Sequence, residues 1–186
     1  ADTGSQKLAG LGLYYLAEYY WQNDQYENTL QCLTESIGYL KNEQMYELLA
    51  RTYNMMGAVS DRKNNRMVAL SSYYNCLQYA EKYHFYYIQG MAESNIAYTL
   101  VRMRLRQEAI QHYRIAIDSY SKSEKTYKRQ QLYDRMWLLS HVYGRNGRGF
   151  TALESNRTDH QRGTGKLLFE NNIRNVSYFL RIITRA

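Results

Sequence analysis

The chain contains no proline in 186 residues, and this absence favours an all-helical fold because nothing interrupts the backbone hydrogen bonds. No apolar stretch approaches the ~20 residues that a membrane-spanning helix needs. Residues 1–6 are polar and lack the basic start of a signal peptide. These absences predict a cytoplasmic protein with no membrane segment. The first residue is Ala1 rather than Met, which suggests an excised or processed fragment.

Residues that carry chemistry are also scarce. The two cysteines, Cys32 and Cys76, are far apart in the sequence, and we expect both to be buried free thiols in a reducing compartment. No cluster of His, Cys and Asp has metal-ligand spacing, so we expect neither a metal nor a cofactor. The glycine-containing segment 163–166 lacks the preceding strand and the following hydroxyl of a phosphate-binding loop. The sequence therefore favours a protein that is not an enzyme.

The net positive charge lies entirely in the last third of the chain. Residues 1–127 carry 13 basic and 13 acidic side chains, whereas residues 128–186 carry 11 basic and 4 acidic ones. A basic end of this kind can attract nucleic acid, an anionic surface or an acidic partner. The alternative is a solvated helical face with no cognate partner.

What the sequence does contain is a pattern that returns every 40 residues. Small residues fall on small ones and apolar residues on apolar ones, at three- and four-residue steps that define one face of a helix. The three copies are Thr29-Leu30, Leu33 and Ser36-Ile37; Ala69-Leu70, Tyr73 and Cys76-Leu77; and Ala109-Ile110, Tyr113 and Ala116-Ile117. A fixed period of this size predicts a solenoid, in which each unit buries its apolar face only by stacking on the next.

A second pattern precedes each copy and indicates a partner helix. Its members are Leu16-Ala17 with Tyr20, Leu49-Ala50 with Tyr53, Ile96-Ala97 with Leu100, and Leu139-Ser140 with Tyr143. Short side chains let the two helices of a hairpin approach closely, and bulky neighbours fill the space beside them. Each unit is therefore predicted to be a hairpin of two helices.

These columns resemble the tetratricopeptide repeat (TPR) family, which pairs a large–small–aromatic pattern on its first helix with Ala, aromatic and Ala on its second. The matching residues are Leu16, Ala17, Tyr20, Tyr26, Thr29, Leu33 and Ser36, and then Ile96, Ala97, Leu100, Ala109, Tyr113 and Ala116. The resemblance covers roughly residues 8–155, although these repeats run nearer ~40 residues than ~34 and lack the repeat-ending proline. Long, proline-poor repeats are similar to those of bacterial signalling proteins, such as peptide-pheromone-responsive regulators and the sensory halves of some diguanylate cyclases.

We therefore predict an all-α fold: a right-handed α-solenoid of about four helix-turn-helix repeats plus a C-terminal helix. The array is expected over residues 5–162, in units of about 5–41, 43–83, 86–122 and 126–162. In the second unit, Gly57 is expected to end the first helix and Ser60-Asp61 to cap the next, with a turn about seven residues longer than in the first unit. A short or frayed helix is expected within residues 144–165, which hold five glycines.

The segment 163–186 carries an a/d stripe of a helix: Phe169, Ile173, Val176, Leu180 and Ile183. Such a helix could cap the last repeat. It could instead be a linker that pairs with its twin in a homodimer or leads into a downstream domain. A little over two heptads is too short a stretch to decide between these alternatives.

The resemblance to TPR domains implies a concave groove lined by the first helix of each unit. Residues on those helices that point away from the packed columns are then the candidate ligand-binding residues: Tyr14, Tyr15, Glu18, Trp21, Arg51, Asn54, Asn95, Tyr98, Arg102, Trp137, His141 and Arg145. Aromatic rings, amides and guanidinium groups suit a peptide, because they offer contact area, backbone hydrogen bonds and bidentate contacts with carboxylates.

The leading hypothesis is a non-enzymatic scaffold that binds a protein or peptide segment, as the sensory or interaction module of a larger bacterial signalling protein. One alternative is a helical repeat protein that binds nucleic acid through its basic last third, although no nucleic-acid-reading motif supports it. Another is self-association through the C-terminal helix.

Overall fold

The computed structural model describes residues 3–123 and residue 132 of the chain. Six helices follow one another: α1 (Thr3–Gln22), α2 (Tyr26–Asn42), α3 (Tyr46–Arg62), α4 (Arg66–Lys82), α5 (Tyr86–Arg102) and α6 (Arg106–Lys122). No strand occurs among the described residues. The chain divides into two compact units, 1–129 and 130–186, and all six helices belong to the first. The predicted fourth repeat (126–162) and C-terminal helix (163–186) lie outside the described residues.

Every linker between the helices has the same length and the same backbone conformation. Each is three residues long, and its middle residue has a positive φ. These middle residues are 20 positions apart: Asp24, Gln44, Asn64, His84 and Arg104. The third residue of each linker donates a backbone hydrogen bond five residues back, as in Met45 N to Leu40 O at 2.9 Å, and its carbonyl then accepts the first bond of the next helix. This is the geometry of a Schellman helix end, here built without glycine.

The uniform linkers show that the prediction for the second unit was wrong. Gly57 does not end a helix, because it lies inside α3 with an ordinary negative φ. Ser60 and Asp61 do not cap a helix either, since both are buried in the last turns of α3. Gly57 is needed for close approach instead: a Cβ at this position would lie 2.4 Å from Cε1 of the buried Tyr73 ring.

The second helices of the three repeats pack through the columns that the sequence predicts. All nine residues of the small and large columns are buried: Thr29, Leu33, Ser36, Ala69, Tyr73, Cys76, Ala109, Tyr113 and Ala116. The hydroxyl of Ser36 also donates to the carbonyl oxygen of Gly10 at 2.9 Å, which satisfies a buried polar group. Burying one large apolar side chain contributes roughly 1.5–3 kcal/mol, so these columns supply much of the stability of the hairpins.

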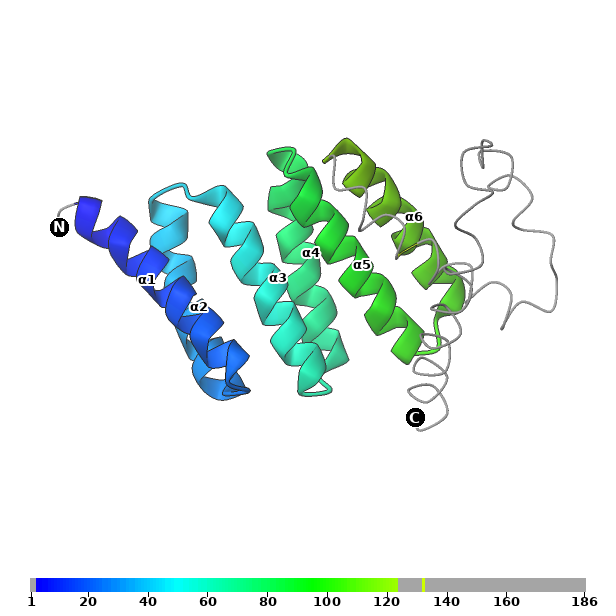
Figure 1. Ribbon diagram of the computed structural model, residues 1–186, viewed down its shortest axis with the longest axis horizontal. Helices are drawn as coiled ribbons and strands as arrows, with labels where there is room; N and C mark the ends of the chain where they lie inside the picture. Colours follow the sequence, from blue (N-terminus) through cyan, green and yellow to red (C-terminus); the bar gives the residue numbers. More distant parts are fainter. Residues whose placement is uncertain (1–2, 124–131, 133–186) are drawn as a thin grey trace, which may run out of the picture. The chain divides into compact units, whose positions relative to one another are not determined.

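The hairpins stack in two layers, with α1, α3 and α5 in one layer and the even-numbered helices in the other (Figure 1). Helices α2 and α4 each pack on the first helix of their own hairpin and of the next one, α6 packs on α5, and α3 also contacts α5 directly. This arrangement is a helical-repeat solenoid in which the first helices share one side.

The first-helix pattern proves to be out of register in the second unit. Positions 40 residues apart are equivalent, so Ala17 corresponds to Gly57 and Ala97, whereas Ala50 corresponds to Gly10 and Gly90. All six are buried or lie in close contact with the second helix. The pair Leu49-Ala50 resembles Leu16-Ala17 only locally, and Leu16 itself is exposed while Leu49 is buried. The shift of seven residues explains the overlong turn predicted there.

Two further expectations can be compared with the described residues. Cys32 and Cys76 are both buried and free, as predicted. Burial raises the pKa of the Cys76 thiol to about 12. Within residues 3–123, each helix is too short or too polar to cross a bilayer.

Candidate functional site

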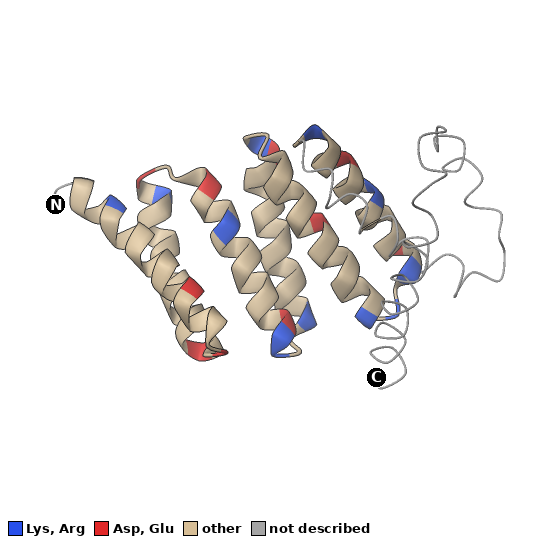
Figure 2. Cartoon of the chain, in the orientation of Figure 1, with Lys and Arg blue, Asp and Glu red and all other residues tan. Residues whose placement is uncertain are grey.

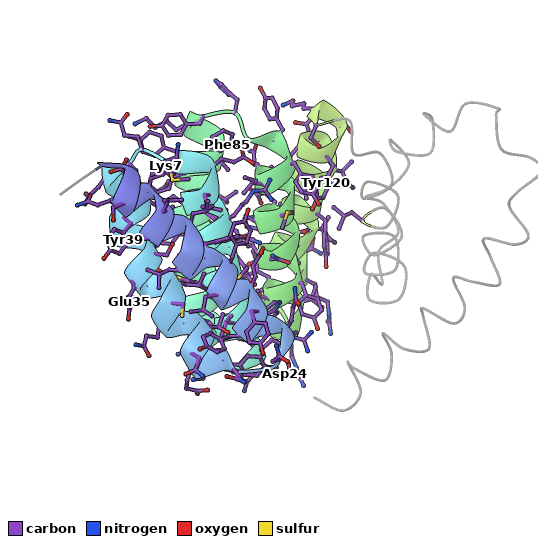
Figure 3. The ribbon with its side chains drawn as sticks, turned by 60° about the vertical axis from the view of Figure 1, so that its left-hand side comes forward. Lys7, Asp24, Glu35, Tyr39, Phe85 and Tyr120 are labelled. Carbon is purple, nitrogen blue, oxygen red and sulfur yellow. The ribbon has the colours of Figure 1, made fainter. Side chains whose placement is uncertain are left out.

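An open cleft of about 580 Å³ lies on the side that the first helices share. Three of its lining residues, Glu43, Gln44 and Met45, form the linker between α2 and α3. The complete lining is Lys7, Leu11, Glu43, Gln44, Met45, Tyr46, Glu47, Leu48, Arg51 and Phe85. Two successive first helices thus contribute, because Lys7 and Leu11 belong to α1, whereas Tyr46, Glu47, Leu48 and Arg51 belong to α3. Phe85 is the last residue of the linker between α4 and α5. Lys7 and Phe85 lie at the same end of the molecule, opposite Asp24 (Figure 3).

The cleft carries both signs of charge. Arg51 Nη2 lies 2.8 Å from Glu47 Oε1, one helical turn away on α3. Both side chains of this pair are partly exposed, and Lys7 and Glu43 add one more charge of each sign. Because exposed ion pairs contribute little to stability, an incoming carboxylate can compete for Arg51 at small cost. Charged residues of both signs also lie at intervals along the other described helices (Figure 2).

A run of aromatic rings extends from the cleft along the second hairpin. Tyr46 stacks on Tyr83 with ring centroids 4.4 Å apart, and Tyr83 is followed by Phe85 at 5.9 Å. The ring centroid of Tyr79 lies 6.0 Å from that of Tyr46 and 6.0 Å from that of Tyr53. A hydrogen bond with Tyr83 raises the pKa of the Tyr46 hydroxyl. The rings are held in fixed orientations, so Tyr46 and Phe85 present rigid apolar surfaces to the cleft.

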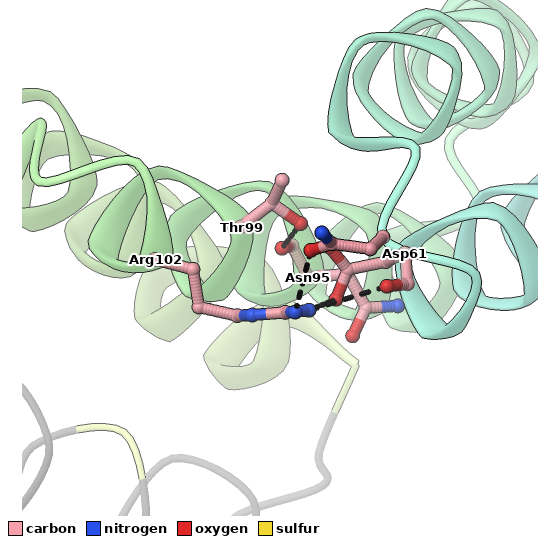
Figure 4. Close-up of polar contacts among 5 residues, drawn as sticks. Asp61, Asn95, Thr99 and Arg102 are labelled. Atoms are coloured by element: carbon pink, nitrogen blue, oxygen red, sulfur yellow. Dashed lines mark hydrogen bonds and ion pairs between the residues drawn. The ribbon is translucent and has the colours of Figure 1, made fainter. Parts of the chain in front are cut away.

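Farther along the same side, polar side chains link α3 to α5 (Figure 4). Asn95 Nδ2 donates to Asn54 Oδ1 at 3.0 Å. Arg102 Nη1 donates to Asp61 Oδ2 at 2.6 Å and to the Asp61 carbonyl oxygen at 3.2 Å, and Nη2 reaches Asn64 Oδ1 at 3.3 Å. Asp61 is buried, and the guanidinium is about one quarter exposed. The predicted ligand-binding residues Asn54, Asn95 and Arg102 therefore hold neighbouring repeats together.

The four predicted residues of α1 separate into different environments. Tyr14 lies in the core with Ala17 and Leu33, so the expectation that it points away from the packed columns is wrong. Burial, followed by a hydrogen bond with Glu18, raises the pKa of its hydroxyl. Tyr15 is exposed, and Glu18 is half-buried.

Trp21 lies near the opposite end of the shared side. It is half-buried, with its ring 5.7 Å from Tyr26 and the guanidinium of Arg62 5.9 Å above it. In α5, Tyr98 is half-buried, and the guanidinium carbon of Arg102 lies over its ring, 5.9 Å from the ring centroid. Of the nine predicted residues that are described, only Arg51 lines the cleft. Trp137, His141 and Arg145 lie outside the described residues.

Sequence reasoning missed most of the cleft, including Lys7, Leu11, Tyr46 and Phe85. One signal was available, because Leu11 stands exactly one period before Arg51 and Lys7 one period before Glu47. The linker residues and Phe85 carry no such signal. They enter the cleft only because the helices between them stack.

The described residues contain no group of three His, Cys, Asp or Glu side chains that could hold a metal ion. A part-buried pair does occur between the two helices of the third hairpin, where Nδ1 of His112 lies 2.6 Å from Oε2 of the buried Glu93. The Tyr74 ring of α4 packs against this imidazole with centroids 6.3 Å apart. The pair joins α5 to α6 and lies away from the residues that line the cleft.

No protein-family model matches this sequence, and comparison with curated proteins finds no significant match. The resemblance to TPR domains therefore remains a prediction from the repeat columns.

Proposed function

We propose that this chain is a non-enzymatic scaffold whose cleft between α1, α3 and Phe85 binds a segment of another protein. The cleft itself carries this proposal: it is open, it spans successive repeats, and it combines rigid rings with charges of both signs. Such a lining suits a short peptide with an apolar side chain beside a carboxylate, since Tyr46 and Phe85 offer apolar area and Arg51 offers a bidentate donor.

The span of the cleft, from α1 across α3 to the linker before α5, supports a role in signalling. A ligand that contacts both α1 and the start of α5 favours whichever spacing of the repeats it fits best, which is a shift between populations. The resemblance to long-repeat TPR proteins is the basis for placing this chain in a larger bacterial signalling protein, as its sensory or interaction module. The charge of residues 128–186 is the sole support for the alternative, nucleic-acid binding.

Peptides selected from a random display library on the intact chain provide the test. Their affinity is measured by isothermal titration calorimetry against the chain and against Arg51→Ala and Tyr46→Ala. We expect each substitution to weaken a selected acidic–apolar peptide by about tenfold or more, equivalent to about 1.4 kcal/mol.

The matched control is Lys41→Ala, which removes an exposed cation from α2 in the other layer. It should leave the affinity unchanged. Equal affinity for the chain, Arg51→Ala and Tyr46→Ala would refute the cleft as the binding site. Selection of nucleic-acid ligands, with affinity that falls steeply as salt rises, would favour the alternative.

A further inference from the structure

The outward face of α1 is apolar and uncovered. Leu8 is 70% exposed, Leu16 41%, Tyr15 58% and Tyr19 59%, and Gly12 lies among them with open space around it. At helical spacing these five residues share one face, and none of them is charged. Large exposed apolar patches on a folded protein mark interaction surfaces.

The equivalent faces of α3 and α5 show what such a face normally does. One period after Leu8, Gly12 and Leu16 stand Leu48, Thr52 and Met56, of which Leu48 and Met56 pack against the core of the preceding hairpin. One period later stand Ile88, Ala92 and Ile96, all buried.

In these two repeats the face has the order large, small, large. The second helix of the preceding hairpin covers it, with α2 packed on α3 and α4 packed on α5. The small residue in the middle lets the covering helix approach closely. On α1 the same order, Leu8–Gly12–Leu16, has no covering helix among the described residues.

The arrangement of this face on α1 fits a second copy of itself. Leu8 and Leu16 stand four residues before and four residues after Gly12, so these three residues are arranged symmetrically about the glycine. If two such helices cross in antiparallel fashion at Gly12, Leu8 of each meets Leu16 of the other. This is the self-complementary contact that a two-fold dimer requires. The absence of charge on the face means that the symmetry axis brings no like charges together.

We propose that the α1 face formed by Leu8, Gly12, Tyr15, Leu16 and Tyr19 is a dimerisation surface, on which α1 of a second copy packs antiparallel with the two Gly12 residues at the crossing point. The dimer covers on α1 the face that α2 covers on α3 and that α4 covers on α5. It uses neither the cleft nor the C-terminal segment, so it can hold two clefts in one assembly.

Sedimentation velocity of the intact chain, from low micromolar to submillimolar concentration, tests the association. We expect a reversible monomer–dimer equilibrium. Leu16→Glu places a carboxylate on the face and should weaken the dimer at least about tenfold. The control Met67→Glu changes a side chain of α4 that is 68% exposed and should leave the equilibrium unchanged. Circular dichroism checks that both variants fold.

Cross-linking tests the geometry. Both natural cysteines are buried, so a cysteine introduced at Gly12 is the accessible thiol within the described residues. A disulfide needs Cα atoms about 4.4–6.8 Å apart, which only a crossing at Gly12 provides. We expect mild oxidation to link Gly12→Cys into a covalent dimer, whereas the exposed control Ser71→Cys on α4 should remain uncoupled.

Three results would overturn the proposal. The first is a chain that stays monomeric at every concentration, which would leave this face to a helix from another source. The second is a dimer that Leu16→Glu does not weaken, which would place the contact elsewhere. The third is equal cross-linking of Gly12→Cys and Ser71→Cys.

Discussion

The packing face of the second helices and the groove face of the first helices follow the same 40-residue period. The packing face keeps the same residue size at equivalent positions, whereas the groove face changes its residue type. On the packing face, the column Ser36–Cys76–Ala116 is small in every repeat and always buried. On the groove face, the column that begins at Leu11 changes to Arg51 and then to Met91. Stacking imposes one geometry at every step, so it fixes the size of the packing residues. The groove residues are free to carry different chemistry in each repeat.

Enlarging a packing residue should produce the largest loss of stability. Gly57→Ala places a methyl group within 2.4 Å of the Tyr73 ring, which is 3% exposed and cannot move aside without repacking. Alanine favours the helix by about 1 kcal/mol, but we expect a net loss of about 2 kcal/mol from overpacking. The free energy of unfolding in urea measures it.

The control for this substitution is Gly38→Ala, in the middle of α2, where an added Cβ meets nothing within 4 Å. It should stabilise the protein by about 0.5–1 kcal/mol through helix propensity alone. If both alanines change stability equally, the packing face does not restrict residue size, and the contrast with the groove face fails.

Removing a polar link on the groove face should cost somewhat less. Arg102→Ala leaves Asp61 without its guanidinium, and Asp61 is largely buried. We expect a loss of about 1.5 kcal/mol, because a charged acceptor is left unsatisfied. Thermal and urea unfolding measure this loss, and Lys41→Ala is the exposed control, expected to stay within about 0.5 kcal/mol.

A double-mutant cycle with Asp61→Asn separates the interaction from other effects of truncation. The double variant should lose less than the sum of the two single losses. Strict additivity would show that the two side chains do not stabilise α3 against α5.

Alkaline pH tests the packing face by titration. The folded protein holds the Cys76 proton until pH values near 12, whereas the ordinary pKa of the thiol is 9.0. Above about pH 9 the unfolded chain therefore binds fewer protons than the folded one, and stability falls as pH rises, by at most about 1.4 kcal/mol per unit for this group. Burial raises the pKa of Tyr73 as well, so tyrosines add to the decline at higher pH.

Cys76→Ala isolates the thiol, since it gives the second repeat the residue that the third carries at Ala116. Between pH 9 and the ordinary pKa of the buried tyrosines, 10.0, urea unfolding should show a shallower decline for Cys76→Ala than for the unsubstituted chain. Parallel curves would contradict a buried, protonated thiol in this column.

The smallest effect is expected in the linkers, which connect the helices of the two layers. Gln44 has a φ of 54°, a conformation that costs a residue with a Cβ about 1 kcal/mol. Gln44→Gly relieves this strain but raises the conformational entropy of the unfolded chain. We therefore expect the free energy of unfolding to rise by only about 0.5 kcal/mol. Asn64→Gly is the matched control and should change stability less, because Asn tolerates a positive φ. A loss of stability for Gln44→Gly would contradict the linker geometry.

The two faces also differ in how far the sequence predicts them. The packing columns repeat in residue size, so Leu33, Tyr73 and Tyr113 could be aligned and the all-helical repeat fold predicted correctly. The first helices have the same period, as in Ala17, Gly57 and Ala97, but Leu49-Ala50 was taken for the equivalent of Leu16-Ala17. Gly57 looked like a helix end because glycine often occupies one, whereas the positive φ falls on residues such as Gln44 and Arg104 that carry no turn signal.

For the candidate site, the sequence-based prediction and the cleft share α1 and α3 but few residues. Arg51 lines the cleft, whereas Asn95 and Arg102 are occupied by Asn54 and Asp61, some 41 positions earlier in the chain. Such pairings follow from how two helices lie side by side. A pattern within one helix does not contain that information, and neither does a linker residue such as Phe85.

The five identical linkers have a consequence for how this molecule changes in evolution. Since each turn imposes the same phase on the next helix, loss or duplication of any 40-residue block joins two equivalent ends without a misfit. Gene rearrangement can therefore lengthen or shorten the protein by whole hairpins while every remaining junction is already folded correctly. The extent of the ligand-facing side is then a matter of copy number, adjustable without inventing a new connection.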